Sequence, residues 1–261
     1  MTESNYESQW WGYIYDQMMT QDLQDLLDDY LRFYRSNLQG ITGPVLECAC
    51  GSGLIFLPLL ETGLDLYGFD ISKPMLNTLK VKAEAQGFAD IDDRVSVQTL
   101  ESFRYEKVFD AIIIPSNTFV MLTTQDDQIK TLKNIYDHLA RDGKFLLDLR
   151  LIGVRELVEH SVGIQGNWYT WTHPETGQPI RQRVDGLADF NNQLIVDRCF
   201  IEYEGQREDF PMTSRWISKD EFQLLLRLAG FSHWESFRTP EKDPLEIGAE
   251  GTHSYWIVYK T

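Results

Sequence analysis

Two acidic side chains in the first third of the chain each end a short apolar run and precede a turn. Glu47 leads into the small-residue sequence Cys48-Ala49-Cys50-Gly51-Ser52-Gly53, and Asp70 leads into Ile71-Ser72. Small residues let a ligand approach the backbone closely, and the free N–H groups of a following helix favour an anionic group such as a carboxylate. A carboxylate at Asp70, about 19 residues after Gly51, suits the hydroxyls of a ribose. Together these residues predict a crevice for a nucleoside.

Two other interpretations of the glycine turn remain open. The turn can simply make a tight connection between a strand and a helix, without any ligand. It can also bind a dinucleotide, although that fingerprint has a third glycine or alanine where this chain has Phe56, and it does not need the acid Glu47. The acid therefore favours a nucleoside that carries an amino acid over one that carries a pyrophosphate.

The segments around these residues alternate between strand and helix patterns. Apolar positions three and four residues apart predict an amphipathic helix over 21–38. Short apolar strands separated by helices then predict a parallel sheet covered on both faces, with right-handed connections. Gly143 is expected to be the turn residue before the fifth strand. The expected strands are 45–48, 64–69, 95–97, 109–114 and 144–149, and the expected helices are one after the glycines, 73–86 and 126–140.

The pattern changes after position 164. Aromatic, β-rich segments separated by turn residues predict an antiparallel insertion. Ser218 and Glu221 form a capping box that opens a helix, and Gly230 ends it. The expected β segments of the insertion are 168–172, 187–190 and 194–203, and two last strands are expected near 233–238 and 255–259.

These patterns divide the chain into three parts. Residues 1–164 form N-terminal helices and a cofactor-binding core, and residues 165–217 form the β insertion, which is expected to be a substrate lid. Residues 218–261 supply the last helix and strands, which complete the core sheet.

Composition argues against several classes of function. A formal net charge of -16 repels a phosphate backbone, so no nucleic-acid partner is expected. No apolar run approaches the ~20 residues that cross a bilayer, and no secretory signal is present, so a cytoplasmic protein without a membrane partner is expected. Cys48, Cys50 and Cys199 are too few for a disulfide framework, and the five histidines are scattered, so no metal site is predicted.

Around the glycine turn the sequence resembles the class I S-adenosylmethionine-dependent methyltransferases. Their first motif, acid-x-Gly-x-Gly-x-Gly after the first strand, is matched by Glu47-x-Ala49-x-Gly51-x-Gly53, with alanine at the first glycine. The resemblance spans roughly residues 10–150 and resumes near 215. It implies a Rossmann-like α/β fold: a mostly parallel seven-stranded sheet with helices on both faces, here with an antiparallel β insertion after strand five. It also implies S-adenosyl-L-methionine as cofactor and S-adenosyl-L-homocysteine as product.

Later motifs of that family imply individual contacts. Asp70 resembles the acid that binds the ribose, and Ile71 or Met75 would then lie against the adenine. Thr99 stands where the family usually has an acid on the adenine amino group, so the neighbouring backbone of Leu100 is implied to make that contact. The segment Pro115-Ser116-Asn117 after the fourth apolar strand resembles the loop that faces the transferred methyl group.

Within the class, Tyr13-Ile14-Tyr15-Asp16 and the β insertion resemble small-molecule N-methyltransferases, both the amino-sugar N,N-dimethyltransferases and the glycine/sarcosine type. In those enzymes an N-terminal tyrosine shapes the methyl-transfer site, and the resemblance implies Tyr13 in that role. An aromatic cluster that packs a helix onto the core is the alternative. Amino-sugar enzymes have a histidine where this chain has Met121, so no histidine base is implied.

The sequence therefore predicts an enzyme that methylates a small molecule, first of all at the nitrogen of an amine-bearing metabolite, once or twice. A neutral amine is already a nucleophile, whereas a hydroxyl usually needs a base or a metal. An O- or C-methyltransferase of a natural-product intermediate, and a non-catalytic S-adenosylmethionine-binding protein, are the alternatives. The small-molecule substrate is the expected partner, and the chain is expected to be a monomer or a homodimer.

The candidate site residues fall into three groups. The predicted catalytic residues are Tyr13 and Asn117. The predicted cofactor contacts are Tyr13, Glu47, Ala49, Gly51, Gly53, Asp70, Ile71, Met75, Thr99, Leu100 and Pro115. The predicted substrate contacts, at strand ends and in the insertion, are Asn117, Phe119, Asp148, Arg150, Trp168, Trp171 and Arg215. The aromatic residues of the insertion are equally explained as the packed face of an antiparallel sheet.

Overall fold

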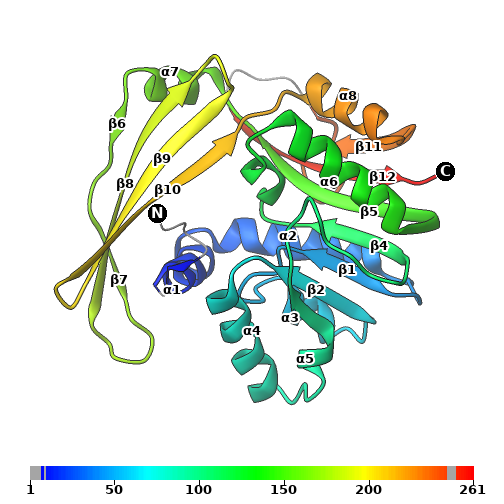
Figure 1. Ribbon diagram of the computed structural model, residues 1–261, viewed down its shortest axis with the longest axis horizontal. Coiled ribbons are helices and arrows are strands. Elements are labelled where there is room, and N and C mark those ends of the chain that lie inside the picture. Colours follow the sequence, from blue (N-terminus) through cyan, green and yellow to red (C-terminus); the bar gives the residue numbers. More distant parts are fainter. Residues whose placement is uncertain (1–6, 9, 246–250) are drawn as a thin grey trace.

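The computed structural model describes residues 7–8, 10–245 and 251–261; residues 1–6, 9 and 246–250 of the predicted parts lie outside the described residues. Two sheets stand side by side, with the smaller one on the left of Figure 1. The helical elements are α1 (Trp11–Gln17), the π-helix η2 (Met18–Asp22), α2 (Gln24–Leu38), α3 (Phe56–Leu60), α4 (Lys73–Ala85), α5 (Ile91–Arg94), η3 (Thr118–Met121), α6 (Gln125–His138), α7 (Val154–Ser161) and α8 (Lys219–Ala229).

The larger sheet has seven strands in the order β11-β12-β5-β4-β1-β2-β3. All neighbours from β3 to β5 are parallel, and β12 runs antiparallel to β5 and to β11. The mostly parallel α/β fold with an antiparallel insertion is thereby confirmed. The strands of this sheet are β1 (Val45–Cys48), β2 (Leu66–Asp70), β3 (Val95–Val97), β4 (Phe109–Ile114), β5 (Leu139–Leu151), β11 (His233–Phe237) and β12 (Thr252–Tyr259).

One expected turn is wrong. β5 begins at Leu139, directly after α6, and Gly143 lies inside the strand instead of ahead of it. The pairing of β5 with β4 shifts register between Phe109 and Ala111, and Asp142 adopts a positive φ of 62°. The break that the glycine suggested is therefore an irregularity within the strand, where the first residues of β5 already pair with β4.

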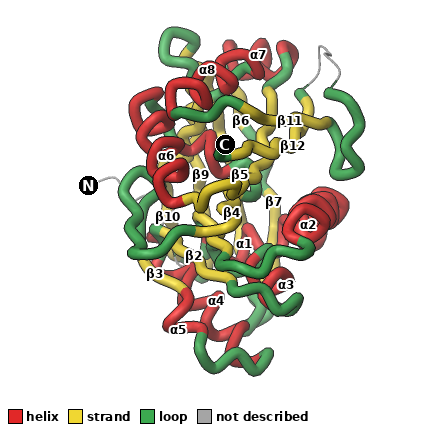
Figure 2. Tube along the Cα trace, turned by 90° about the vertical axis from the view of Figure 1, so that its right-hand side faces the viewer, coloured by secondary structure: helices red, strands yellow, loops and turns green. Residues whose placement is uncertain are grey.

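Alternating residues of the central strands bury two separate faces. On one face Val45, Ala111 and Ile113 pack against α2, α3 and α4, and on the other Leu46, Ile112 and Ile114 pack against α6 and α8. Figure 2 shows α6 and α8 on one side of the strands and α2 and α3 on the other. A parallel sheet covered on both faces needs apolar side chains on both, which explains the continuous apolar runs of β1 and β4.

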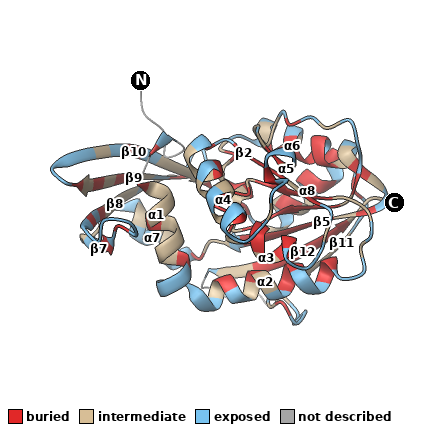
Figure 3. Cartoon of the chain, turned by 90° about the horizontal axis from the view of Figure 1, so that it is seen from below, coloured by how far each residue is buried: buried red, intermediate tan, exposed pale blue. Residues whose placement is uncertain are grey.

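The smaller sheet is antiparallel and lies between β5 and α8 in the sequence. Its inner face packs on α1, where Trp10 and Ile14 contact Ile180, Cys199 and Ile201. In Figure 3 its strands are largely intermediate or exposed, whereas the strands of the larger sheet are mostly buried. Its strands are β6 (Ile164–Gln165), β7 (Tyr169–Thr172), β8 (Pro179–Asp189), β9 (Leu194–Tyr203) and β10 (Gln206–Arg215).

Among the described residues, no helix has the length and apolar character that crossing a membrane requires. Within the same ranges, no three or more His, Cys, Asp or Glu side chains gather as a metal ion would need. The three cysteines, Cys48, Cys50 and Cys199, are buried and free.

Candidate active site

A cavity of about 480 Å³ opens at the carboxyl ends of β1, β2 and β4. This is the edge at which open α/β sheets bind their ligands. Its walls come from the glycine turn after β1, the start of α4, the loops after β3 and β4, helix α1 and the smaller sheet. Segments far apart in the sequence therefore meet around one space.

The glycine turn contributes an acid with one unsatisfied oxygen. Glu47 on β1 is fully buried and lines the cavity, and its Oε2 has no hydrogen-bond partner among the described residues. Burial, and secondarily the charge of Asp70, raise the pKa of Glu47 well above its ordinary value. A buried oxygen without a donor is costly. Glu47 therefore suits a ligand that brings an N–H or ammonium group to this wall.

Asp70 holds the floor of the cavity together. Its Oδ2 accepts the backbone N–H of Gly51 at 2.8 Å, and its Oδ1 accepts that of Ser72 at 2.7 Å. Burial raises the pKa of Asp70, and these backbone donors oppose that shift. The carboxylate thus fixes the glycine turn against the start of α4, and it still lines the cavity.

The small residues of the turn have different roles. Gly51 has a φ of +50°, and a Cβ added there would lie 3.2 Å from Cε of Met75, so the slot between turn and helix is narrow. Gly53 does not line the cavity: a Cβ there would lie 3.0 Å from Leu57 and from Leu79, so it serves helix packing instead. Ala49 lines the cavity with a φ of 58°, a left-handed conformation that usually favours glycine.

The next wall comes from the loops after β2 and β3. All four residues predicted for the adenine, Ile71, Met75, Thr99 and Leu100, line the cavity. Gln98 and Glu101 line it as well, although the sequence interpretation did not select them. The sequence does contain a signal for Glu101: it is an acid only two positions after Thr99, where the resemblance implies an acid near the adenine.

The loop after β4 has an unusual backbone that a buried acid maintains. Ser116 and Asn117 both adopt left-handed conformations, with φ of 60° and 56°, and both line the cavity next to Pro115. Their N–H groups donate to Oδ1 and Oδ2 of Asp148, at 2.8 and 2.6 Å, and the hydroxyl of Tyr34 donates to Oδ1 at 2.7 Å. Asp148 therefore lies beneath the loop and supports it, whereas we expected it to contact substrate directly.

Two further predicted substrate contacts near this loop also have other roles. The backbone N–H of Arg150 donates to Oδ1 of Asn117 at 2.8 Å, and its guanidinium binds Glu156 outside the cavity lining. Phe119 is fully buried against Phe222, with ring centroids 5.4 Å apart. The chain turns at η3, so the residues after Phe119 face the cavity while Phe119 faces the core.

Helix α1 presents Tyr15, not Tyr13, to the cavity. Residues two apart on a helix are separated by about 200° around its axis, so only one of the two can face this way. Tyr15 lines the cavity and hydrogen-bonds the Ser116 side chain, and burial raises the pKa of its hydroxyl to about 12. Tyr13 instead packs against His173, with ring centroids 4.7 Å apart. Position on the helix, which residue type alone does not reveal, separates the two tyrosines.

A polar contact fastens α1 to the glycine turn. The Asp16 carboxylate accepts hydrogen bonds from Nζ of Lys82, at 2.5 Å, and from the hydroxyl of Ser52. The same Nζ also donates a hydrogen bond to the Ser52 carbonyl oxygen at 3.2 Å. These residues come from α1, α4 and the turn, so the contact sets the position of Tyr15 relative to the turn.

The smaller sheet closes the cavity with three residues, Asp197 on β9 and Met212 and Ser214 on β10. The tryptophans predicted from this region do not line it. Nε1 of Trp171 donates to Gln182 at 2.9 Å within the core of the smaller sheet. Trp168 lies under a guanidinium group, with Cζ of Arg181 4.6 Å from its ring centroid. The alternative that these aromatics form a packed sheet face describes both better.

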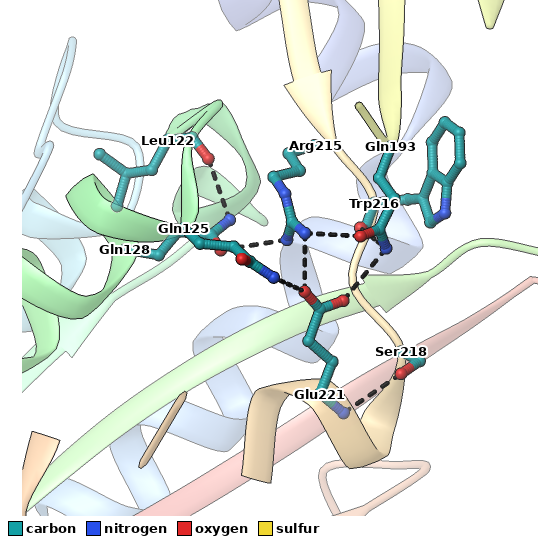
Figure 4. Close-up of polar contacts among 8 residues, drawn as sticks. All are labelled: Leu122, Gln125, Gln128, Gln193, Arg215, Trp216, Ser218 and Glu221. Atoms are coloured by element: carbon teal, nitrogen blue, oxygen red, sulfur yellow. Dashed lines mark hydrogen bonds and ion pairs between the residues drawn. The ribbon is translucent and has the colours of Figure 1, made fainter. Parts of the chain in front are cut away.

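Arg215, another predicted substrate contact, is the centre of a buried polar network (Figure 4). Its guanidinium donates to Glu221 at 2.7 Å, to Gln193 at 2.7 Å and to Gln128 at 3.2 Å. Gln128 in turn donates to the carbonyl of Leu122, a cavity residue, at 2.9 Å. The network joins the end of β10 to α6 and α8, so Arg215 anchors the smaller sheet to the core instead of contacting substrate.

Of the capping box predicted at the start of α8, the Ser218 half is present, whereas the Glu221 carboxylate binds Arg215, Gln193 and Gln125 in the network. The Ser218 side chain accepts the N–H of Glu221 at 3.2 Å, and Gly230 ends the helix with a φ of +104°. Glu221 therefore lies in the first turn of α8 and also pairs with Arg215.

The cavity fits S-adenosylmethionine on its own features. The unpaired Glu47 oxygen suits the ammonium of a methionine tail, and Gly51, which has no side chain, leaves the narrow slot beside Met75 open to a ligand. Asp70 is placed for ribose hydroxyls, and Ile71 and Met75 offer apolar surface to a base. These residues would hold the cofactor.

Comparison with known proteins agrees with this geometry. Residues 45–143 match the family model described as "Methyltransferase domain". A "Putative methyltransferase YqeM" of Bacillus subtilis (strain 168) is 28% identical over 84% of this chain and 83% of its own length. A "Glycine/sarcosine N-methyltransferase" of Halorhodospira halochloris is 31% identical over 69% of this chain and 66% of its own length.

The fold is also known from solved structures. The crystal structure of an S-adenosylmethionine-dependent methyltransferase from Clostridium acetobutylicum ATCC 824 superposes with a TM-score of 0.74, covering 95% of this chain and 97% of that one at 17% identity. The strand order, the cavity at the strand ends and the sequence matches lead to one conclusion: the chain is a class I S-adenosylmethionine-dependent methyltransferase that acts on a small molecule.

Proposed function

We propose that this enzyme transfers the methyl group to the nitrogen of an amine-bearing metabolite. The observation that carries the proposal is the composition of the acceptor side of the cavity. Within the described residues, this side offers one acid, Asp197, and the neutral groups Tyr15, Asn117, Thr118 and Ser214, with no histidine and no lysine. Such groups orient an acceptor, and a neutral amine needs orientation more than it needs a base.

In the proposed step the lone pair of the amine nitrogen forms the new bond to the methyl carbon. Bound S-adenosylmethionine supplies that methyl on a positively charged sulfur, which keeps the electron pair of the broken bond and leaves as a thioether. The new ammonium then releases one proton to solvent, and the neutral product can accept a second methyl. Tyr15 and Asn117 line the cavity from two different elements, α1 and the loop after β4, and are the groups proposed to align the acceptor.

The Halorhodospira halochloris relative, whose name specifies an N-methyltransferase, supports the same chemistry, because its match covers 69% of this chain. O-methylation is the second candidate. The observation in its favour is Asp197, whose pKa burial raises to about 6, since a carboxylate of this kind can accept a hydroxyl proton.

The test is product analysis after incubation with S-adenosylmethionine and parallel sets of amines and of phenols and alcohols. A mass increase of about 14 per methyl, localised to nitrogen by fragmentation, is expected only with the amines. Transfer to oxygen alone would reject the proposal in favour of the second candidate. Cofactor binding without any product from either set would indicate the non-catalytic alternative.

Tyr15→Phe provides a sharper check, because Tyr13→Phe is a matched control on the same helix. We expect Tyr15→Phe to lower kcat by about tenfold, since one hydrogen bond at the reacting centre is worth on the order of 1 kcal/mol. Tyr13→Phe should leave kcat unchanged, because that ring packs away from the cavity. Equal effects of the two substitutions would remove Tyr15 from the proposed site.

A further inference from the structure

All charged side chains that line the cavity have the same sign. In the described part of the chain the lining includes Glu47, Asp70, Glu101 and Asp197, and it includes neither lysine nor arginine. Residues 1–6, 9 and 246–250 contain no lysine or arginine in the sequence. The buried Oε2 of Glu47, which has no partner among the described residues, independently offers a position for a hydrogen-bond donor of a ligand. The cavity is thus built for positive or neutral ligand groups.

Two cationic residues that contact lining residues, Lys82 at Ser52 and Arg150 at Asn117, are already paired elsewhere. Lys82 binds Asp16 beneath the glycine turn, at 2.5 Å. Arg150 forms a two-bond contact with Glu156. Neither side chain lines the cavity, so an acidic group on the acceptor would find no cation there without breaking one of these pairs.

Asp197 is the acid that the smaller sheet contributes. It lies opposite Met212 in the β9–β10 register, and both residues line the cavity. Along β9, Cys199 and Ile201 share its face, which is the inner one, whereas Arg198 lies on the outer face. Among the described residues its ion-pair partner is His160, whose Nε2 is 3.9 Å from Oδ1, and Glu156 adds a second negative charge nearby. Burial raises the pKa of Asp197, because the ionised carboxylate is less well solvated there than in the unfolded chain. An ionised carboxylate at this position therefore destabilises the folded state, which is typical of a functional group.

The other three acids come from the core strands and loops, where the cofactor fits. Asp197 faces them from the side of the smaller sheet, together with Met212 and Ser214. It is therefore the charged group that an acceptor, entering between the two sheets, meets after the cofactor is bound.

Resting on N-methylation as the activity, we propose that the acceptor is a small amine without a carboxylate or phosphate group, and that Asp197 selects it. The Asp197 carboxylate attracts the ammonium form of the amine into the cavity. The amine then releases one proton to solvent, so that its lone pair is free to attack the methyl carbon, while the carboxylate accepts a hydrogen bond from the remaining N–H or from a neighbouring hydroxyl. A carboxylate on the acceptor would face Asp197 without a lysine or arginine of the lining to compensate it, and like charges held together in a closed site are strongly unfavourable. Free glycine and sarcosine, which the relative's name specifies, are thereby excluded as substrates of this chain.

The test uses pairs of amines that differ by an acidic group: glycinamide and glycine, serinol and serine, glucosamine and glucosamine 6-phosphate. S-adenosylhomocysteine formation is measured for each, and each is also titrated calorimetrically into enzyme saturated with S-adenosylhomocysteine. We expect turnover and binding only with the members that lack the acid. Asp197→Asn should raise KM or Kd for these amines about tenfold or more, with a smaller change in kcat, because a charge-assisted hydrogen bond is lost.

Asp209→Asn is the matched control, since Asp209 lies on the adjacent strand and binds Arg198 on the outer face. Asp209→Asn should leave KM, Kd and kcat for these amines unchanged. Equal use of glycine and glycinamide, an Asp197→Asn variant that equals the wild type, or failure of every amine to bind or react would each overturn the inference. Transfer to the oxygen of serinol, with the same dependence on Asp197 and on charge, would overturn N-methylation and leave the charge selection standing.

Discussion

Glu47 and Asp70 end neighbouring parallel strands, and both are buried, yet they differ in what surrounds their oxygens. Asp70 accepts two backbone N–H groups, whereas Glu47 keeps one oxygen without a partner. The charge of Asp70 also adds to the rise in the pKa of Glu47. A cationic ligand group would relieve both costs at once, which explains why two acids are tolerated side by side at the bottom of the cavity.

Asp70→Ala tests the floor of the site. We expect the affinity for S-adenosylhomocysteine to fall by about 1–3 kcal/mol, because ribose hydroxyls lose a charged acceptor and the turn loses its restraint. Calorimetry measures the affinity, and thermal unfolding shows whether the variant is folded. Asp65→Ala, at an exposed acid before the same strand, is the control. Unchanged affinity in a folded Asp70→Ala variant would remove Asp70 from the site.

Ala49 pays a backbone cost that the usual glycine avoids. A left-handed conformation destabilises a residue with a Cβ by roughly 1–2 kcal/mol. Glycine avoids this strain, but its greater conformational freedom in the unfolded chain destabilises the folded state by somewhat less than that. Ala49→Gly should therefore raise the free energy of unfolding by about 0.5–1 kcal/mol. Urea unfolding measures it, with Ala83→Gly inside α4 as a control that should change stability in the opposite direction. Destabilisation by Ala49→Gly would show that its methyl group packs productively.

At the scale of elements, the site depends on two segments that other elements hold in place. Helix α1 is bound on one side to the glycine turn through Asp16 and on the other to the smaller sheet, where Gln17 exchanges two hydrogen bonds with Thr172, at 2.7 and 3.1 Å. The loop after β4 is held from below by Asp148. Each wall of the acceptor side is therefore supported from outside the cavity.

Asp148→Asn tests the support of that loop and has a defined pH dependence. Burial raises the pKa of Asp148 from 3.8 to about 6, so the carboxyl favours the folded state below pH ~4 and this contribution is lost as pH rises through about 6. The variant lacks this titration, so its stability deficit relative to the wild type should be larger at pH 4 than at pH 7. Urea unfolding at both pH values measures it, and an equal deficit would contradict the prediction.

The same variant should slow methyl transfer even where it is stable. The asparagine side chain has one acceptor oxygen, whereas the N–H groups of Ser116 and Asn117 donate to two oxygens of Asp148. One of the two N–H groups therefore loses its acceptor, and the loop is expected to leave its left-handed conformation. Single-turnover rates at pH 7 report this loss, and unchanged rates would show that the left-handed loop does not need both oxygens.

At the scale of the whole molecule, the smaller sheet reaches the core through α1 at one end and through the Arg215 network at the other (Figure 4). The network is polar and largely buried, so removing one partner leaves another uncompensated. Since Gln128 of this network also binds the carbonyl of Leu122, its geometry extends to the cavity wall.

Arg215→Met should lower the free energy of unfolding by about 3 kcal/mol, because Glu221 loses its cation in a poorly solvated position. Arg198→Met removes an exposed pair on the outer face of the same sheet and should cost less than about 1 kcal/mol. Urea unfolding compares them, and hydrogen exchange should show faster opening of β9 and β10 only in Arg215→Met. Equal costs would mean that the network is not the anchor of the sheet.

The core fold and the cofactor side of the site could be predicted from the sequence because their signals are local. The glycine turn between Glu47 and Gly53, the acid at Asp70 and the capping box at Ser218 each lie within a few consecutive residues, and chain periodicity supplies the strands around them. The acceptor side was predicted less well. The sequence predicts Tyr13, whereas Tyr15 faces the cavity; it also predicts Asp148 and Arg215 as substrate contacts, whereas both support the walls.

The sequence by itself determined the alternation of strands and helices, the acids at the strand ends and the overall negative charge, because hydrophobic periodicity and turn chemistry act between near neighbours along the chain. Only the tertiary structure decided which face of α1 meets the cavity, which acid of β9 points inward and which charges are already paired. Those outcomes depend on how α1, the loop after β4 and the smaller sheet pack against one another, and residues brought together across such distances leave no periodic signal in the sequence.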